Sequence, residues 1–135
     1  ILRSKNEFYI PEDVIIFMTM NTIDKSTEEV DDALMGRLAA VEILPRAEDL
    51  SEMLSVNAIP EALRQKILEL FAEIQTIYPL GHGYFAGLRG EITTTELLRY
   101  YRTRIRPVLS NSLGVLRAGE LTKIDNLVDE MFGKI

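Results

Sequence analysis

Residues 60–77 read PEALRQKILELFAEIQTI, and this stretch decides the fold class. Its apolar side chains recur at spacings of three and four along the chain: Leu63, Ile67, Leu70, Phe71, Ile74 and Ile77. This period places them on one face of a helix and leaves the charged and amide side chains on the other. Pro60 suits the first helical position, where its missing N–H costs no helical hydrogen bond. We therefore predict an amphipathic helix whose apolar face packs in a core.

The same helical period continues on both sides of this stretch. It predicts three further helices, over residues 47–54, 93–105 and 120–132. Pro107 either interrupts the second of these or opens another helix, because proline does not fit a regular helix interior. Residues 47–135 are therefore predicted to form a small helical bundle.

The first part of the chain has a different pattern. Residues 13–20 are a continuous apolar run rich in β-formers, which indicates a buried parallel strand. We expect a short helix over residues 26–37 and a second strand over residues 39–44, as in a βαβ unit. The predicted fold class is mainly α: a truncated α/β segment of strand, helix and strand in residues 1–46, followed by the helical domain of residues 47–135.

Composition narrows the classes of function. The chain has 135 residues, 47% of them hydrophobic, and a formal net charge of -6. Such a charge argues against nucleic-acid binding by the whole surface, since phosphate binding depends on Lys and Arg. The absence of cysteine excludes disulfides and thiolate metal sites and fits a reducing compartment. No apolar run approaches the roughly 20 residues of a membrane span, so we expect a cytoplasmic protein that does not contact a membrane. The first residue is not Met, so we expect the chain to belong to a longer protein.

Several segments resemble the McrB-type AAA+ proteins, in that family's order. IPEDVIIFMTMNTIDKS at residues 10–26 is similar to an IPEN-like lead and a strand that ends in GTMNTADRS. DDALMGRL at residues 31–38 resembles the D-x-A-L-R-R-R-F segment at the ring interface. GHGYF at residues 81–85 resembles the GHSYF motif of the lid, and RIRPVL at residues 104–109 resembles an I-x-P-L-L helix. The resemblance covers most of residues 8–109 and implies a sensor-1 strand, a subunit interface and a helical lid bundle.

The resemblance assigns two catalytic residues. Asn21, after the first predicted strand, would be sensor 1 and would orient the attacking water or a γ-phosphate oxygen. Alternatively, Asn21 only turns the chain after the strand. Arg37 would be an arginine finger that reaches a neighbouring subunit's nucleotide, or else a solvated arginine at a helix end. The sequence departs from the family here, because Met35 and Gly36 stand where arginines are expected.

The lid resemblance assigns two nucleotide-binding residues. His82 would approach a phosphate from the lid, or it is a packed turn residue. Tyr84 would contact the nucleotide, although Tyr84 and Phe85 fit an anchoring role in the bundle core better than base stacking. No metal ligand set is expected.

A cluster of arginines follows the lid motif, at positions 99, 102, 104 and 106. It could contact phosphate or a partner, or it is a solvated face paired with acidic neighbours.

The sequence lacks a G-x-x-x-x-G-K-[ST] loop and an apolar run that ends in Asp-Glu. We therefore expect no hydrolysis by this chain alone and no bound cofactor. In the parent protein the resemblance implies GTP or ATP with magnesium, a ring of identical copies, a nuclease subunit and DNA reached through the parent complex. A remodelling ATPase of the MoxR or dynein-related type and a non-catalytic helical interaction module remain alternatives. Since the strand that would lie between the two predicted strands is absent, we expect the α/β segment to be rearranged or paired with another copy.

Overall fold

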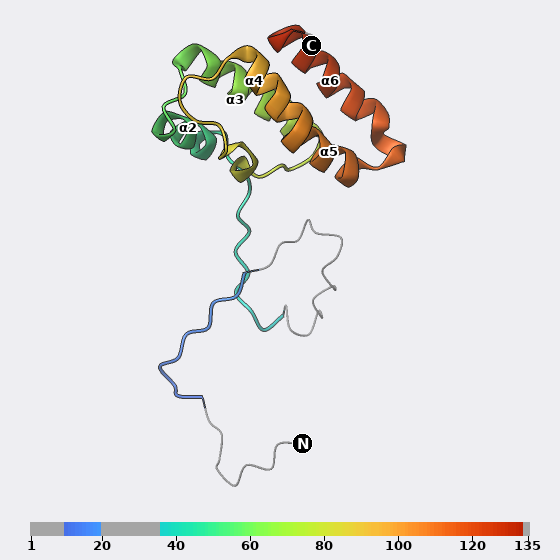
Figure 1. The fold of residues 1–135 in the computed structure, drawn as a ribbon. Helices are drawn as coiled ribbons and strands as arrows, with labels where there is room; N and C mark the ends of the chain where they lie inside the picture. The colour runs from blue at the N-terminus through green and yellow to red at the C-terminus, as the bar shows by residue number, and fades with distance from the viewer. Residues whose placement is uncertain (1–9, 20–35, 134–135) are drawn as a thin grey trace. The chain divides into compact units, whose positions relative to one another are not determined.

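The computed structural model describes residues 10–19 and 36–133, and its regular secondary structure there is helical (Figure 1). The helices are, in order, α2 (Ala47–Val56), α3 (Glu61–Ile77), the 3-10 helix η1 (His82–Phe85), α4 (Thr94–Tyr100), the π-helical turn η2 (Tyr101–Ile105), α5 (Arg106–Leu113), the 3-10 turn η3 (Val115–Arg117) and α6 (Ala118–Phe132). The prediction of a mainly α fold is confirmed. Across the described ranges, no helix is long and apolar enough to cross a membrane.

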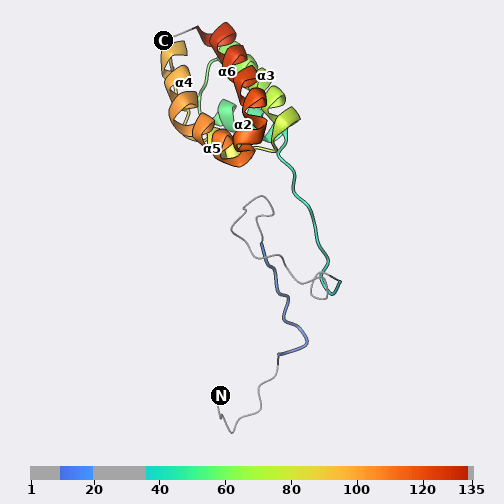
Figure 2. The same ribbon diagram turned by 90° about the vertical axis from the view of Figure 1, so that its right-hand side faces the viewer.

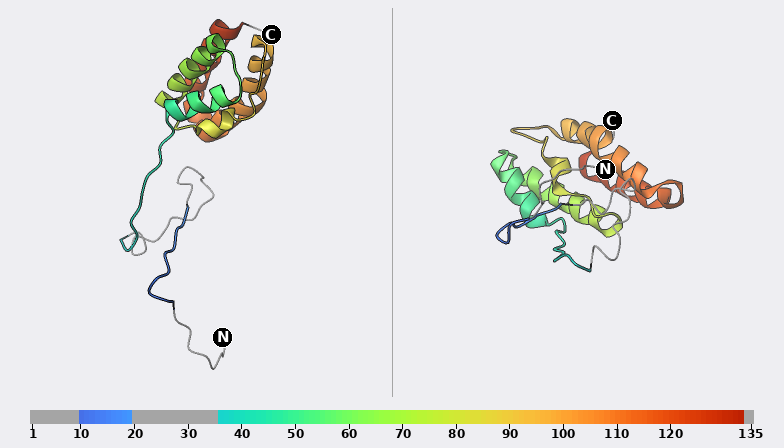
Figure 3. Two further views of the ribbon diagram at one scale, coloured as in Figure 1. Left: turned by 90° about the vertical axis from the view of Figure 1, so that its left-hand side faces the viewer. Right: turned by 90° about the horizontal axis from the view of Figure 1, so that it is seen from below.

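The chain divides into two compact units, residues 1–41 and residues 42–135. The helices named above lie in the second unit, where α6 contacts α3, α4 and α5 (Figure 2). The short helix α2 contacts α3 and η1 (Figure 3). One apolar core joins these helices, and it includes Leu50, Leu54, Ile67, Leu70, Phe71, Ile74, Phe85, Leu97, Leu98, Tyr101, Ile105, Leu109, Ile124 and Val128. Since no charged residue is buried among the described residues, burial of apolar surface is the main source of stability of this bundle.

Helix α3 agrees with the prediction made from its apolar period. The predicted range was 60–77, and the helix runs over Glu61–Ile77; Pro60, predicted as the first helical residue, is instead the N-cap, with ψ 141°. Its buried residues are Ile67, Leu70, Phe71 and Ile74. The period of three and four therefore identified the packed face correctly.

The end of α2 contains a left-handed residue that is not glycine. Ala58 has φ 58°, and its N–H donates to the carbonyl oxygen of Ser55 at 3.0 Å. The next N–H, of Ile59, donates to the carbonyl oxygen of Leu54 at 3.0 Å, and both of these side chains are buried. This pair of bonds is the Schellman ending of a helix, in which the left-handed position usually carries glycine because a Cβ is strained there.

Replacing Ala58 with glycine is therefore expected to stabilise the chain by about 0.5–1 kcal/mol, because the relief of strain exceeds the added entropy of the unfolded state. Urea unfolding followed by circular dichroism measures the change. Ala72→Gly, at an exposed position in the interior of α3, is the matched control and should destabilise by a similar amount. Destabilisation by both substitutions would contradict this account of Ala58.

The residues from α4 to α5 form one continuous helical segment. Its middle part is the π-helical turn η2 (Tyr101–Ile105), which we call the wide turn. The N–H of Arg106 donates to the carbonyl of Tyr101, five residues earlier, where an α-helix would bond four residues back. Pro107 follows in the first turn of α5. A proline has no N–H to donate, and its ring crowds the carbonyl four residues before it. Pro107 thus neither ends the helix nor fits a regular one, and the wide turn lies just before it.

Helix α4 begins with a side-chain cap. The Thr93 hydroxyl accepts from the N–H of Glu96 at 3.2 Å, and the Glu96 carboxylate accepts from the N–H of Thr93 at 2.8 Å. This reciprocal pair is a capping box. The Thr93 N–H is the main cause that lowers the pKa of Glu96 below its usual range, so this carboxyl is ionised at neutral pH.

The two predicted strands are not formed in the described residues, and that prediction was wrong. Residues 13–19 and residues 39–44 have no regular secondary structure, and their apolar side chains, such as Phe17 and Ile43, are exposed. A strand is stable only when neighbouring strands satisfy its N–H and C=O groups, and the described residues provide no strand with which either segment is paired. Pairing with a second copy stays a prediction. The helix predicted over residues 26–37 lies almost entirely outside the described residues.

Candidate functional site

Two of the residues predicted to act in a nucleotide site lie together in η1. His82 is the first residue of this 3-10 helix and Tyr84 is its third. Arg37 lies in an exposed turn of the first unit. Asn21 lies outside the described residues. The catalytic roles predicted for Asn21 and Arg37 stay predictions, and among the predicted nucleotide-site residues the structure gives side-chain surroundings for His82 and Tyr84.

Asn57 fixes the backbone that leaves η1. Its amide Nδ2 donates to the carbonyl oxygens of Leu88 at 2.9 Å and Ala86 at 3.4 Å. The N–H of Gly90 donates in return to the carbonyl oxygen of Asn57 at 2.8 Å. The end of α2 and the segment after η1 are thereby joined by bonds in both directions, which hold the segment in one conformation.

Tyr100 fixes the other side of the same loop from α4. Its hydroxyl donates to the carbonyl oxygen of Tyr84 at 2.8 Å and accepts from the N–H of Gly87 at 3.3 Å. A Cβ on residue 87 would lie only 2.8 Å from this hydroxyl oxygen. Glycine at position 87 is therefore what permits the close approach of the loop to the Tyr100 ring.

The two aromatic residues of η1 have different surroundings. Phe85 is fully buried and packs edge-on against Phe71, with ring centroids 5.8 Å apart at 79°. Tyr84 is 46% exposed. The anchoring role predicted from the sequence therefore holds for Phe85 and is wrong for Tyr84, whose ring can be reached by a ligand. Contact between Tyr84 and a nucleotide stays a prediction.

His82 is partly buried, and its Nδ1 atom is shielded from solvent. Within the described residues this nitrogen has no hydrogen-bond partner. A buried nitrogen without a partner is uncommon in folded proteins, because losing its hydrogen bond to water is costly. Since this nitrogen is shielded from solvent, it does not face an incoming ligand, and contact between His82 and a nucleotide stays a prediction.

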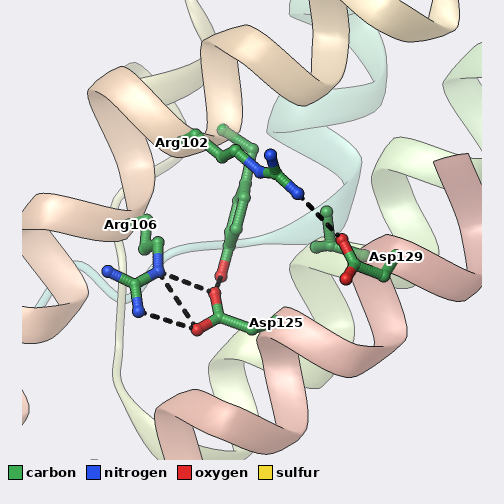
Figure 4. A pocket seen from close by; sticks show the side chains of 6 residues that line it. Arg102, Arg106, Asp125 and Asp129 are labelled. Atoms are coloured by element: carbon green, nitrogen blue, oxygen red, sulfur yellow. Dashed lines mark hydrogen bonds and ion pairs between the residues drawn. The ribbon is translucent and has the colours of Figure 1, made fainter. Parts of the chain in front are cut away.

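A charged cluster joins the wide turn to α6 and lines a hollow of about 400 Å³ (Figure 4). Arg106 Nε donates to both carboxylate oxygens of Asp125, at 3.0 and 3.1 Å, and its terminal nitrogen lies 2.9 Å from Oδ2. Arg102 donates to Asp129 at 3.1 Å. The two arginines are matched by two carboxylates, so this hollow has no spare charge with which to bind an ion. The ion pairs of this cluster join the wide turn and the start of α5 to α6.

Tyr101 adds a hydrogen bond to the same contact with α6, from the side of the core. Its ring is 2% exposed, and its hydroxyl donates to Asp125 Oδ1 at 2.9 Å. Burial, followed by the hydrogen bond to Asp125, raises the pKa of Tyr101 far above its ordinary value. The hydroxyl therefore remains protonated and acts as a donor. The same carboxylate raises the pKa of Arg106.

Three residues that position the η1 loop and the Tyr101 hydroxyl were not predicted from the sequence: Asn57, Tyr100 and Asp125. Their contacts join residues 13 to 31 positions apart in the chain, and helical periodicity carries no information on such pairs. The glycines at residues 81–87 predict unusual backbone angles, but none of these three glycines has a positive φ, and Gly87 instead permits the close approach to Tyr100. In the described ranges, no group of three or more His, Cys, Asp or Glu side chains could hold a metal ion.

Comparison with known proteins gives one relative. The chain is 37% identical over 96 residues to the type IV methyl-directed restriction enzyme EcoKMcrB subunit of Escherichia coli (strain K12), which covers 62% of this chain and 21% of that protein. The chain thus spans about a fifth of the relative that it matches. No family model matches the chain, and no solved structure does. The similarity supports a McrB-like relationship at a coarse level.

Proposed function

We propose that the chain supplies the sensor-1 segment, part of the subunit interface and the helical lid of a GTP-driven AAA+ motor in a modification-dependent restriction system. The observation that carries this proposal is the similarity to the McrB subunit over 96 residues. The order of the motifs, with Asn21 first, Arg37 next and the GHGYF lid segment last, agrees with it.

The geometry of the lid is compatible with this role. Asn57 and Tyr100 hold the η1 loop from two different helices. A loop held in this way can present His82 and Tyr84 to a nucleotide without paying for their ordering at the moment of binding. GTP or ATP with magnesium, identical copies in a ring, a nuclease subunit and DNA belong to the proposal as the parent's cofactors and partners. The relative found favours a restriction system over a MoxR-type remodelling ATPase.

Nucleotide hydrolysis by the complete gene product tests this function. We expect magnesium-dependent hydrolysis, with GTP preferred to ATP, and a higher rate with the nuclease partner present. Asn21→Ala and Arg37→Ala should each lower kcat while nucleotide binding is kept, because these side chains act on the transition state. Arg89→Gln, at an exposed lid residue, serves as the control. A complete gene product that neither binds nor hydrolyses nucleotide would refute the proposal.

A further inference from the structure

Four arginines lie in the wide turn or directly beside it, and they fall into two pairs with different surroundings. Arg102 and Arg106 face α6 and are bound to carboxylates there. Arg99 and Arg104 line a separate hollow of about 520 Å³. Its lining residues are Gly87, Glu96, Arg99, Tyr100, Thr103 and Arg104, and we call it the basic hollow.

Arg99 lies near the end of α4 and Arg104 lies in the wide turn that follows it, so the widening between them reduces the angle that separates the two side chains. In a regular α-helix, residues five positions apart point about 140° away from each other. A π-helical turn bonds residue i to residue i+5 and so brings such residues to the same side. Tyr101 and Arg106, also five apart, illustrate the effect, because both side chains bond to Asp125. Turns of this kind are frequent at functional sites, so the placement of Arg99 beside Arg104 calls for an explanation.

The charge in the basic hollow is not balanced. Among the described residues, neither Arg99 nor Arg104 forms an ion pair, whereas Arg102, Arg106 and Arg117 do so. Glu96, the single carboxylate that lines the hollow, accepts from the N–H of Thr93 at 2.8 Å and from its hydroxyl at 2.9 Å. The negative charge of Glu96 is thus partly compensated by the hydrogen bonds that cap α4. Two guanidiniums against this one carboxylate leave the hollow positive, on a chain whose formal net charge is -6.

We propose that the basic hollow binds a phosphate group, held between the guanidiniums of Arg99 and Arg104. The planar fork of a guanidinium matches phosphate oxygens in a bidentate way, which a lysine ammonium cannot reproduce. The hollow is open to solvent, so a ligand can reach both guanidiniums from outside. The phosphate comes either from a free polyphosphate or from the backbone of a single nucleic-acid strand. The acidic balance of the whole chain means that any strand contact made by it is local. This inference does not depend on the proposed motor function.

Two probes test the proposal on the 135-residue chain. Inorganic pyrophosphate is titrated by calorimetry, and a labelled single-stranded oligonucleotide of roughly eight nucleotides by fluorescence anisotropy. Arg99→Gln and Arg104→Gln are each expected to weaken binding by about tenfold, the loss of one charged hydrogen-bonding group. Arg99→Lys keeps the charge and should give a smaller loss. Arg89→Gln removes the same charge from an exposed arginine that does not line the hollow, and it should leave the affinity nearly unchanged.

The outcomes separate the two sources of phosphate. Pyrophosphate binding that depends on Arg99 and Arg104 supports the hollow as a site for a free polyphosphate. Oligonucleotide binding with this dependence, when pyrophosphate does not bind, supports a strand backbone. The proposal is overturned if neither probe shows such binding at roughly millimolar concentration. An equal loss in Arg89→Gln would also overturn it, because binding would then follow overall charge. Circular dichroism of each variant checks that these exposed substitutions leave the helical bundle intact.

Discussion

Replacing Phe71 with alanine is expected to lower the free energy of unfolding by about 3–5 kcal/mol. The ring is 1% exposed and lies at the centre of α3's packed face. Its removal leaves a cavity and also ends the edge-to-face contact with Phe85. Small domains have a total stability of about 5–15 kcal/mol, so this variant should be close to unfolding at physiological temperature. Thermal unfolding followed by circular dichroism gives the size of the loss.

The same substitution should loosen the η1 loop before the bundle unfolds. Phe85 anchors that loop, and Phe71 is its aromatic neighbour. Native-state hydrogen exchange should therefore show faster exchange at the N–H groups of Ala86 and Leu88 in Phe71→Ala. Val56→Ala, at a side chain 80% exposed, is the control and should change stability by less than about 0.5 kcal/mol. A loss below about 1 kcal/mol in Phe71→Ala would show that this ring is not part of a packed core.

The helices were predictable because their signals are local. In α3 the apolar residues repeat within one turn of each other, and the cap of α4 involves only Thr93 and Glu96. Each of these interactions closes within three or four residues, so a short window of sequence contains it. The prediction of strands over residues 13–20 and 39–44 was wrong because a strand depends on partners that are distant in the sequence. A continuous apolar run indicates a strand only if partner strands exist elsewhere, and the run itself does not supply them.

The wide turn lies between these two cases. Tyr101, Ile105, Leu109 and Leu113 are all buried and are spaced by four. In a uniform α-helix each step of four drifts by about 40° around the axis, so the last of them would leave the core. One extra residue in η2 absorbs that drift. The repeated spacing of four, together with Pro107, was a signal of this turn in the sequence, and it was not used.

The candidate site was only partly predictable. The resemblance singled out His82 and Tyr84, and both residues lie in η1. Its fixed geometry comes from Asn57 and Tyr100, which are distant in sequence and belong to no local pattern. The arginine cluster shows the same limit. The sequence left a phosphate contact and a paired, solvated face as alternatives, and the wide turn separates the cluster into Arg102 and Arg106, which are paired, and two arginines that are not.

Replacing Asp125 with alanine is expected to lower the free energy of unfolding by about 1–3 kcal/mol, the cost of a buried hydroxyl left without its partner. The Tyr101 hydroxyl donates to Asp125 at 2.9 Å, and the tyrosine side chain is 2% exposed. Arg106 also loses its partner, but its side chain is 44% exposed and can be hydrated instead. Urea unfolding measures the loss.

Two comparisons isolate the role of the tyrosine. Asp129→Ala removes the partner of Arg102 alone, at an exposed ion pair, and should cost no more than about 1 kcal/mol. In the background of Tyr101→Phe, which has no hydroxyl to satisfy, Asp125→Ala should cost clearly less than in the original chain, since the two effects share one hydrogen bond. Equal costs in both backgrounds would mean that Asp125 acts through Arg106 alone. The wide turn would then be fastened to α6 by surface charge, and its stability should fall with added salt. A cost that depends on Tyr101 and does not change with added salt would instead show that the Tyr101–Asp125 hydrogen bond joins the wide turn to α6 at the edge of the core. This bond would then stabilise the turn that contains Arg104.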